Sequence, residues 1–419
     1  MKNQSLFACK QSVNISVSAA FRRFLYLRTK CGVASSSKPA TKTNDNEDDM
    51  PKVIYSLGPA MGHNRYVYGI DSNSRIRYIL NALEDAKLTP EFRGSKIKQL
   101  TKIRKATLEE ITSVHSRSYY SFLEKTVEDA KASEDGLIEI EKSKPLPTYV
   151  TGTTLNDSLI AAGTGLSLVD AVVAASRIIE NPPVGFALIR PPGHHAIRDR
   201  AMGGCIFNNV SIAARYAQRK HGLKRVFIID FDAHHGNGTS DAFYDDPGVF
   251  YLSTHQDGCY PVDTGRFDDI GSGNGEGATL NLPLPQLSGD VAMRTAFDEV
   301  IVPCAQRFKP DMILVSAGYD GHHLEGTSDW QMTTRISYPL AYGIKQLAED
   351  LCGGHCVFFL EGGWRTDTLK VSIEESFRAF IGEPSIANNF EKQFDYWLKD
   401  EPSSQIKQAI QRVKNLHSL

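Results

Sequence analysis

Residues 230–238 read Asp-Phe-Asp-Ala-His-His-Gly-Asn-Gly and follow directly on the apolar run of residues 226–229, Val-Phe-Ile-Ile. A short apolar run of this kind is typical of a buried strand, and parallel strands carry reactive groups at their carboxyl ends. Asp232 and His234 are separated by one residue, so both side chains can point to the same side and share one divalent metal ion. A carboxylate beside an imidazole suits zinc or iron(II). The stretch predicts a metal site; the alternative is a solvated loop with polar caps.

Short apolar runs alternate with longer helical patterns, which predicts an α/β protein with a mainly parallel sheet covered by helices on both faces. Neither an internal repeat nor a linker divides residues 51–383, so we expect one domain there, followed by a polar helical segment at residues 384–419. Besides residues 226–229, the expected strands are 53–56, 184–189, 249–253, 312–316 and 357–360, and the expected helices are 158–179, 210–221, 289–308 and 334–351.

Composition and charge argue against several classes of protein. The 419 residues carry a formal net charge of −2, which gives no electrostatic reason to expect direct contact with a nucleic acid. The seven cysteines lack the paired short spacings of a structural zinc site, which favours a reduced compartment over a disulfide framework. No apolar run approaches the length needed to span a bilayer, so we expect no membrane contact.

The amino end has the composition of an organelle transit peptide. Residues 1–44 contain eight basic residues, many serines and no acidic residue, and an acidic stretch begins at Asp45. We expect residues 1–50 to be a transit peptide and linker outside the fold, addressed to the plastid, with the mitochondrion as the alternative. A disordered basic tail is the other interpretation.

Polar motifs follow five of the predicted strands. They occupy residues 191–195, 230–238, 255–258, 318–321 and 361–364. Because the carboxyl ends of parallel strands meet at one edge of a sheet, we expect these motifs to converge on one crevice.

These motifs resemble the zinc-dependent histone deacetylase family, and more closely its class II branch, the acetylpolyamine amidohydrolases and the organelle-targeted plant members. The resemblance extends over residues 53–383 and is carried by separated motifs in the family's order. It implies a three-layer fold of the arginase/deacetylase type. It also implies one Zn²⁺ per chain, held by Asp232, His234 and Asp320, which leaves room for water and a substrate carbonyl.

The resemblance also assigns roles around the metal. His194 and His195 match the family's tandem histidines, with His195 as general base and His194 as its more buried electrostatic partner. Asp230 and Asn237 match the residues that orient these two rings. The family also binds monovalent cations through backbone oxygens near this turn, and a structural K⁺ is left open.

Two departures from the family concern the substrate pocket. Trp364 stands where the family has the tyrosine of Gly-Gly-Tyr, whose hydroxyl donates to the oxyanion, and an indole has only one N–H. Gly204 stands where the family usually has the phenylalanine of Gly-Phe-Cys, whereas Tyr260 keeps the second aromatic wall. A glycine there for backbone geometry alone is equally compatible with the sequence. The predicted substrate-binding residues are Gly204, Phe207, Tyr260 and Gly363.

The expected function is zinc-dependent hydrolysis of an N-acetylated amine or lysine in a remodelled pocket. The main alternative is a metal-dependent enzyme of small-molecule metabolism, of an amine or alkaloid type, that no longer hydrolyses acetyl-lysine. A third possibility is a binder of acylated ligands without catalysis. The retained histidines argue against this third possibility, because a binder needs no general acid–base groups.

Overall fold

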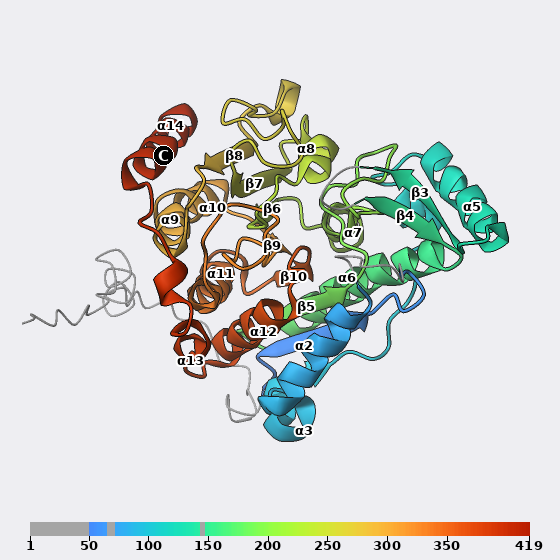
Figure 1. Cartoon of the computed structure of the whole chain (residues 1–419), viewed down its shortest axis with the longest axis horizontal. Coiled ribbons are helices and arrows are strands. Elements are labelled where there is room, and N and C mark those ends of the chain that lie inside the picture. Colours follow the sequence, from blue (N-terminus) through green and yellow to red (C-terminus); the bar gives the residue numbers. More distant parts are fainter. Residues whose placement is uncertain (1–49, 65–71, 143–146) are drawn as a thin grey trace, which may run out of the picture. The chain divides into compact units, whose positions relative to one another are not determined.

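An eight-stranded sheet forms the centre of the protein in the computed structural model, which describes residues 50–64, 72–142 and 147–419 (Figure 1). The strand order is β2-β1-β5-β10-β9-β6-β7-β8, and all neighbouring strands are parallel. The predicted transit peptide, apart from Met50, lies outside the described residues. The strands are β1 (Val53–Gly58), β2 (Ile97–Gln99), β5 (Val184–Ile189), β6 (Val226–Asp230), β7 (Val249–Gln256), β8 (Thr279–Leu284), β9 (Met312–Ala317) and β10 (Cys356–Leu360).

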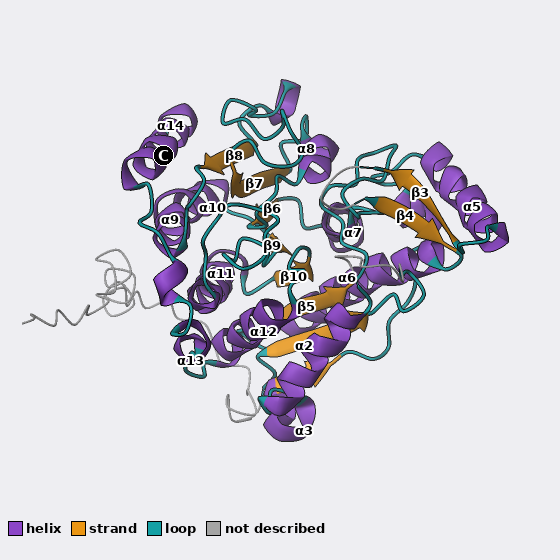
Figure 2. Ribbon diagram, viewed as in Figure 1, coloured by secondary structure: helices purple, strands orange, loops and turns teal. Residues whose placement is uncertain are grey.

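Helices cover both faces of this sheet and bury two hydrophobic cores (Figure 2). Side chains alternate along each strand, so Phe227 and Ile229 lie in one core, and Val226 and Ile228 in the other. This arrangement confirms the predicted α/β class with a mainly parallel sheet. The helices are α2 (Ser74–Asp85), α3 (Pro90–Arg93), α4 (Leu108–Ile111), α5 (Arg117–Ala132), α6 (Thr154–Ser176), α7 (Asn209–His221), α8 (Asn237–Phe243), α9 (Asp290–Ala296), α10 (Val302–Phe308), α11 (Ser337–Cys352), α12 (Thr366–Ile381), α13 (Ala387–Glu391) and α14 (Ser403–His417).

The structure differs from the sequence prediction in several elements. The predicted helix at residues 289–308 is divided into α9, a π-helical turn at Phe297–Ile301, and α10. Pro303 near the start of α10 has no backbone N–H to continue a regular helix. The sequence also gave no prediction for β2, β8 or the antiparallel hairpin of β3 (Leu137–Glu141) and β4 (Thr148–Thr151). β2 and β8 lie at the two edges of the sheet.

Helix α6 contradicts the expectation that no apolar segment is long enough to span a bilayer. It has 23 residues and a mean hydropathy of 1.7 over its most apolar window, and among the described helices it alone meets this criterion. However, 61% of that window is buried inside the protein, against β1 and β5. Its apolar composition is thus that of a core helix packed on a sheet.

Residues 384–419 are largely helical but do not form a separate unit. They belong to the compact unit that contains all the described residues. Glu391 of α13 is buried, and its Oε1 lies 3.0 Å from Nε2 of His322, two residues after the predicted metal ligand Asp320. Three apolar side chains of α14 complete the core at the edge of the sheet: Ile406, Ile410 and Val413. The carboxyl-terminal segment therefore supports both the core and the loop that carries Asp320.

Candidate active site

The carboxyl ends of β5, β6, β9 and β10 bring most of the predicted site residues into one pocket. The pocket encloses roughly 390 Å³, counting space open to solvent. It is lined by Pro192, His194, His195, Gly203, Cys205, Asp232, His234, Tyr260, Asp320, Thr327, Gly362 and Trp364. Four of the five predicted strand-end motifs contribute to this pocket, whereas residues 255–258 do not line it.

Three buried side chains at the bottom of this pocket could hold a metal ion. The ligand atoms of Asp232, His234 and Asp320 all lie within 4.8 Å of one another. His234 Nδ1 is 3.0 Å from Asp232 Oδ1 and 3.0 Å from Asp320 Oδ2. His234 Nε2 lies 3.1 Å from the carbonyl oxygen of Thr327, an acceptor, so Nε2 carries the proton and the lone pair of Nδ1 faces the carboxylates. Two carboxylates and a correctly oriented imidazole fit a catalytic zinc site.

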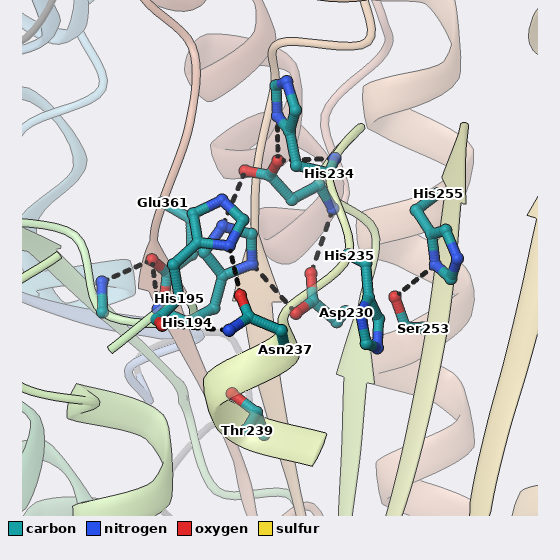
Figure 3. A network of polar contacts seen from close by, with 12 residues as sticks. His194, His195, Asp230, His234, His235, Asn237, Thr239, Ser253, His255 and Glu361 are labelled. Carbon is teal, nitrogen blue, oxygen red and sulfur yellow. Dashed lines mark hydrogen bonds and ion pairs between the residues drawn. The ribbon is translucent and has the colours of Figure 1, made fainter. Parts of the chain in front are cut away.

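The tandem histidines differ in protonation because their partners differ (Figure 3). His195 Nδ1 donates to Asn237 Oδ1 at 2.9 Å, which leaves Nε2 free as a base. Burial, together with the nearby charge of His194, holds the pKa of His195 well below its usual value. Burial would also lower the pKa of His194, but the carboxylates of Asp232 and Asp230 outweigh it and raise this pKa to about 10. The surroundings of His194 therefore favour its charged form, and those of His195 favour its neutral form.

Asp230 orients the ring of His194 through a contact with its Nδ1. Its Oδ2 lies 3.1 Å from His194 Nδ1 and accepts the hydroxyl of Tyr251 at 3.0 Å. Asn237 is the first residue of α8, so the start of that helix fixes the amide that orients His195. The structure therefore places Asp230 and Asn237 where the family resemblance implied.

Replacing Asn237 by aspartate tests this difference in protonation. A carboxylate in place of the amide would favour the protonated form of His195 and raise its pKa. Because His195 acts as a base only when neutral, the rate is lost as pH falls through its pKa. We therefore expect the acid limb of the kcat/KM profile of the N237D variant to move to higher pH. An unchanged acid limb would exclude His195 as the titrating base.

Glu361, for which the sequence suggested no role, also belongs to the site. It follows β10 directly and is fully buried, and its Oε2 accepts the backbone N–H groups of Gly193 at 2.7 Å and His194 at 3.2 Å. Burial raises the pKa of Glu361 to about 7. The carboxyl group therefore anchors the loop of the tandem histidines to the strand that leads to Trp364. Its position directly after an apolar run was the available signal.

Trp364 keeps a hydrogen-bond donor inside the pocket. Its indole Nε1 donates to Asp320 Oδ2 at 3.3 Å, and this is the same oxygen that faces His234 Nδ1. The N–H therefore lies beside the ligand atoms rather than pointing to solvent. The sequence could not show that this N–H reaches the site.

Of the predicted substrate-binding residues, Tyr260 lines the pocket, whereas Gly204 and Gly363 are not among its lining residues. Tyr260 lines it and packs edge-on against His195, with 5.0 Å between ring centroids. At residues 203–204, the lining glycine is Gly203: a Cβ there would lie 2.6 Å from the His195 ring and 2.9 Å from that of Tyr260. Gly204 has φ +76°, a left-handed backbone conformation that favours glycine over other residues. Its N–H donates to Thr148 Oγ1 at 2.9 Å. Likewise, Gly362 rather than Gly363 lines the pocket.

The prediction that Phe207 contacts substrate is wrong. The side chain is 1% exposed and lies in the hydrophobic core, stacked on Tyr120 and edge-on to Tyr119. The next residue, Asn208, caps the start of α7 by accepting the N–H of Ser211, and Phe207 turns into the space between α5 and α7.

Replacing Phe207 by alanine should therefore affect stability and leave the metal site intact. We expect the free energy of unfolding to fall by about 3–5 kcal/mol, because a buried ring is removed from a packed core. Denaturant unfolding measures this change, and bound zinc per folded chain should stay at the wild-type value. Phe122 of α5, which is 50% exposed, provides a control whose alanine variant should unfold almost as the wild type does. A loss of zinc without a loss of stability would return Phe207 to the site.

Comparison with known proteins identifies the family. The Histone deacetylase domain family matches residues 70–380. The chain is 57% identical to histone deacetylase 14, chloroplastic, of Arabidopsis thaliana, over 88% of this chain and 85% of the relative. It is 54% identical to histone deacetylase 10, chloroplastic, of Oryza sativa subsp. japonica, over 88% of this chain and 81% of the relative. Both relatives are chloroplastic, which supports the predicted plastid localisation.

The fold comparison agrees with the sequence comparison. The crystal structure of the HDA15 HD domain superposes with a TM-score of 0.73 at 28% identity, covering 88% of this chain and 95% of that domain. This likeness confirms the expected arginase/deacetylase-type architecture. The chain belongs to the histone deacetylase family and is a hydrolase of the deacetylase type.

Proposed function

We propose that this protein is a zinc-dependent amidohydrolase that removes the acetyl group from an N-acetylated amine or lysine, in a pocket remodelled relative to the acetyl-lysine tunnel of the family. One observation supports the proposal: His195, whose surroundings favour the neutral form, and three side chains that could hold a metal ion line the same pocket. An amide is a poor electrophile, so its hydrolysis requires both parts.

Each part of the site has a role in this reaction. Zinc held by Asp232, His234 and Asp320 would polarise the acetyl carbonyl and lower the pKa of the attacking water. Nε2 of His195 accepts a proton from that water as its oxygen bonds to the carbonyl carbon. The same nitrogen then returns a proton to the departing nitrogen as the C–N bond breaks, which yields acetate and the free amine. The charge of His194 favours the negative charge that develops on the carbonyl oxygen.

Trp364 is the main reason to keep the alternative of a metal-dependent enzyme that does not hydrolyse acetyl-lysine. An indole is larger than a phenol and its donor sits on the ring, so it changes both the shape of the pocket and the direction of the hydrogen bond. Loss of a well-placed oxyanion donor typically reduces turnover by about 10²- to 10³-fold. A short or broad acetylated amine is therefore the preferred substrate class in this proposal.

Acetate release from three kinds of substrate tests the proposed function. The purified chain, loaded with zinc, would be incubated with an acetyl-lysine peptide, an acetylated polyamine and an N-acetyl arylalkylamine. Zinc-dependent release of acetate from any of them supports hydrolysis, and the ranking of kcat/KM identifies the substrate class. Tight binding of all three without acetate release would contradict the proposal and favour a binder. Metal-dependent conversion of other metabolites without acetate release would favour the alternative enzyme.

A further inference from the structure

A buried cation from α2 contacts both the backbone and the ring at Trp364. Arg75 is fully buried, and its Nε and Nη2 donate to the carbonyl oxygens of Gly363 at 2.7 Å and Glu361 at 2.6 Å. The guanidinium carbon also lies 4.3 Å from the centroid of the Trp364 ring. Arg75 and Gly363 are 288 positions apart in the sequence. The Arg75 side chain nevertheless contacts both the turn after β10 and one face of the Trp364 indole.

A carboxylate from another element holds the backbone of the same residue. Glu325 Oε2 accepts the N–H of Trp364 at 2.9 Å and of Arg365 at 3.0 Å, and Oε1 accepts the hydroxyl of Thr368 at 2.9 Å. Glu325 therefore also satisfies free backbone donors at the start of α12. Glu325 lies five residues after Asp320. The loop that follows β9 therefore supplies both the acceptor of the indole N–H, Asp320, and the acceptor of the Trp364 backbone N–H, Glu325.

These contacts restrict the orientation of the indole. Two carbonyl acceptors fix the guanidinium, and the guanidinium in turn fixes the plane of the ring that stacks on it. Glu325 fixes the point from which the side chain starts. With both ends held, Nε1–H donates to Asp320 Oδ2 inside the pocket that Trp364 lines together with the candidate metal ligands.

We propose that Arg75 and Glu325 are positioning residues that hold the indole of Trp364 so that its N–H donates to the acetyl carbonyl oxygen of the substrate. This inference rests on the proposed function and deepens it, because it assigns the missing phenol's role to an indole. A competing role is that the N–H only supports the ligand Asp320. The two roles differ in consequence: the first concerns turnover, and the second concerns metal affinity.

The position of the indole can be measured without any catalysis. The emission difference between a protein and its W364F counterpart isolates Trp364 from the other two tryptophans, Trp330 and Trp397. We expect R75K and E325Q each to change this difference spectrum and to increase quenching by acrylamide. Arg77 is exposed on the same helix, so R77K is the matched control and should leave the spectrum unchanged. Unchanged emission in both R75K and E325Q would overturn the proposed positioning.

A double-mutant cycle connects this position to turnover. With acetate release as readout, R75K should lower kcat by about tenfold with little change in KM, the size of one cation–π contact. The same change in the W364F background should have almost no further effect, because its target is absent. Zinc affinity should stay constant in W364F. If R75K and W364F lowered kcat by independent factors that multiply in the double variant, the proposal would be overturned. A loss of zinc affinity in W364F would show that the N–H supports the ligand Asp320 instead.

Failure of the proposed function can be distinguished from failure of this inference. If the wild-type chain releases acetate from none of the substrates, the proposed hydrolysis fails, and with it the assigned carbonyl contact. The spectra of R75K, E325Q and R77K then still decide whether Arg75 and Glu325 position the indole. R75K retains the positive charge, and thermal unfolding verifies that each variant is folded before its spectrum is compared.

Discussion

Replacing His195 by alanine is expected to lower kcat for acetate release by about 10²- to 10⁴-fold, the usual contribution of a general base. The reason is geometric: Nδ1 is committed to Asn237, so Nε2 is the nitrogen of this ring that remains available to the attacking water. Initial rates with the best of the three substrate classes measure the effect. Bound zinc per chain should not change, because His195 is not among the three predicted ligands.

His221 provides the matched control for this prediction. It is a histidine at the end of α7, its Nε2 lies 2.7 Å from Asp170 Oδ1, and it is not among the pocket-lining residues. H221A should therefore retain the wild-type rate. If H195A retained a comparable rate, the general base would have to be another group.

Replacing Asp320 by asparagine is expected to weaken zinc binding by more than a hundredfold and to abolish acetate release. Loss of a residue that only supports a ligand typically weakens metal binding by about 10- to 100-fold, and loss of a ligand's charge should exceed this. Asp320 Oδ2 faces His234 Nδ1 at 3.0 Å, and Oδ1 accepts the N–H of Ala233 at 3.0 Å. Asparagine can keep the second contact but not the charge.

Metal analysis of the purified D320N variant and a competition assay with a zinc chelator measure this change. Asp268 is half-exposed and pairs with Arg266 at the surface, so D268N is the control and should bind zinc as the wild type does. Full zinc occupancy in D320N together with normal turnover would remove Asp320 from the ligand set.

Local sequence patterns predicted the parts of the site that lie directly at strand ends. Asp232, His234 and Asp320 follow the buried strands β6 and β9, and parallel pairing of these strands places them together. The motif of the two histidines after β5 was placed on the same basis, and the family resemblance implied their roles. β2 and β4 were missed because they have only three and four residues, too few for a periodic signal. β8 and β3 do alternate in polarity, as Thr-Leu-Asn-Leu-Pro-Leu and Leu-Ile-Glu-Ile-Glu, and this signal was overlooked.

Tertiary contacts determined what the sequence could not indicate. Phe207 and Cys205 are two residues apart, yet the Phe207 ring lies in the core while Cys205 lines the pocket. The chain turns here into α7, whose cap, Asn208, directly follows Phe207. Arg75 reaches the turn at Gly363 across 288 positions of sequence, and no local pattern marks such a contact. The direction of the Trp364 N–H depends on this contact and on Glu325.

Titration of the metal-free chain with zinc tests directly whether acetate release depends on one bound zinc ion and on His195. Protein stripped of metal with a chelator would receive zinc in steps, and acetate release from the best acetylated amine or lysine substrate would be followed at each step. We expect the rate to rise in proportion to zinc, to reach its limit at one ion per chain, and to stay near zero in H195A at every step. A rate independent of zinc, or one zinc bound per chain with no acetate released from any of the three substrate classes, would contradict this expectation.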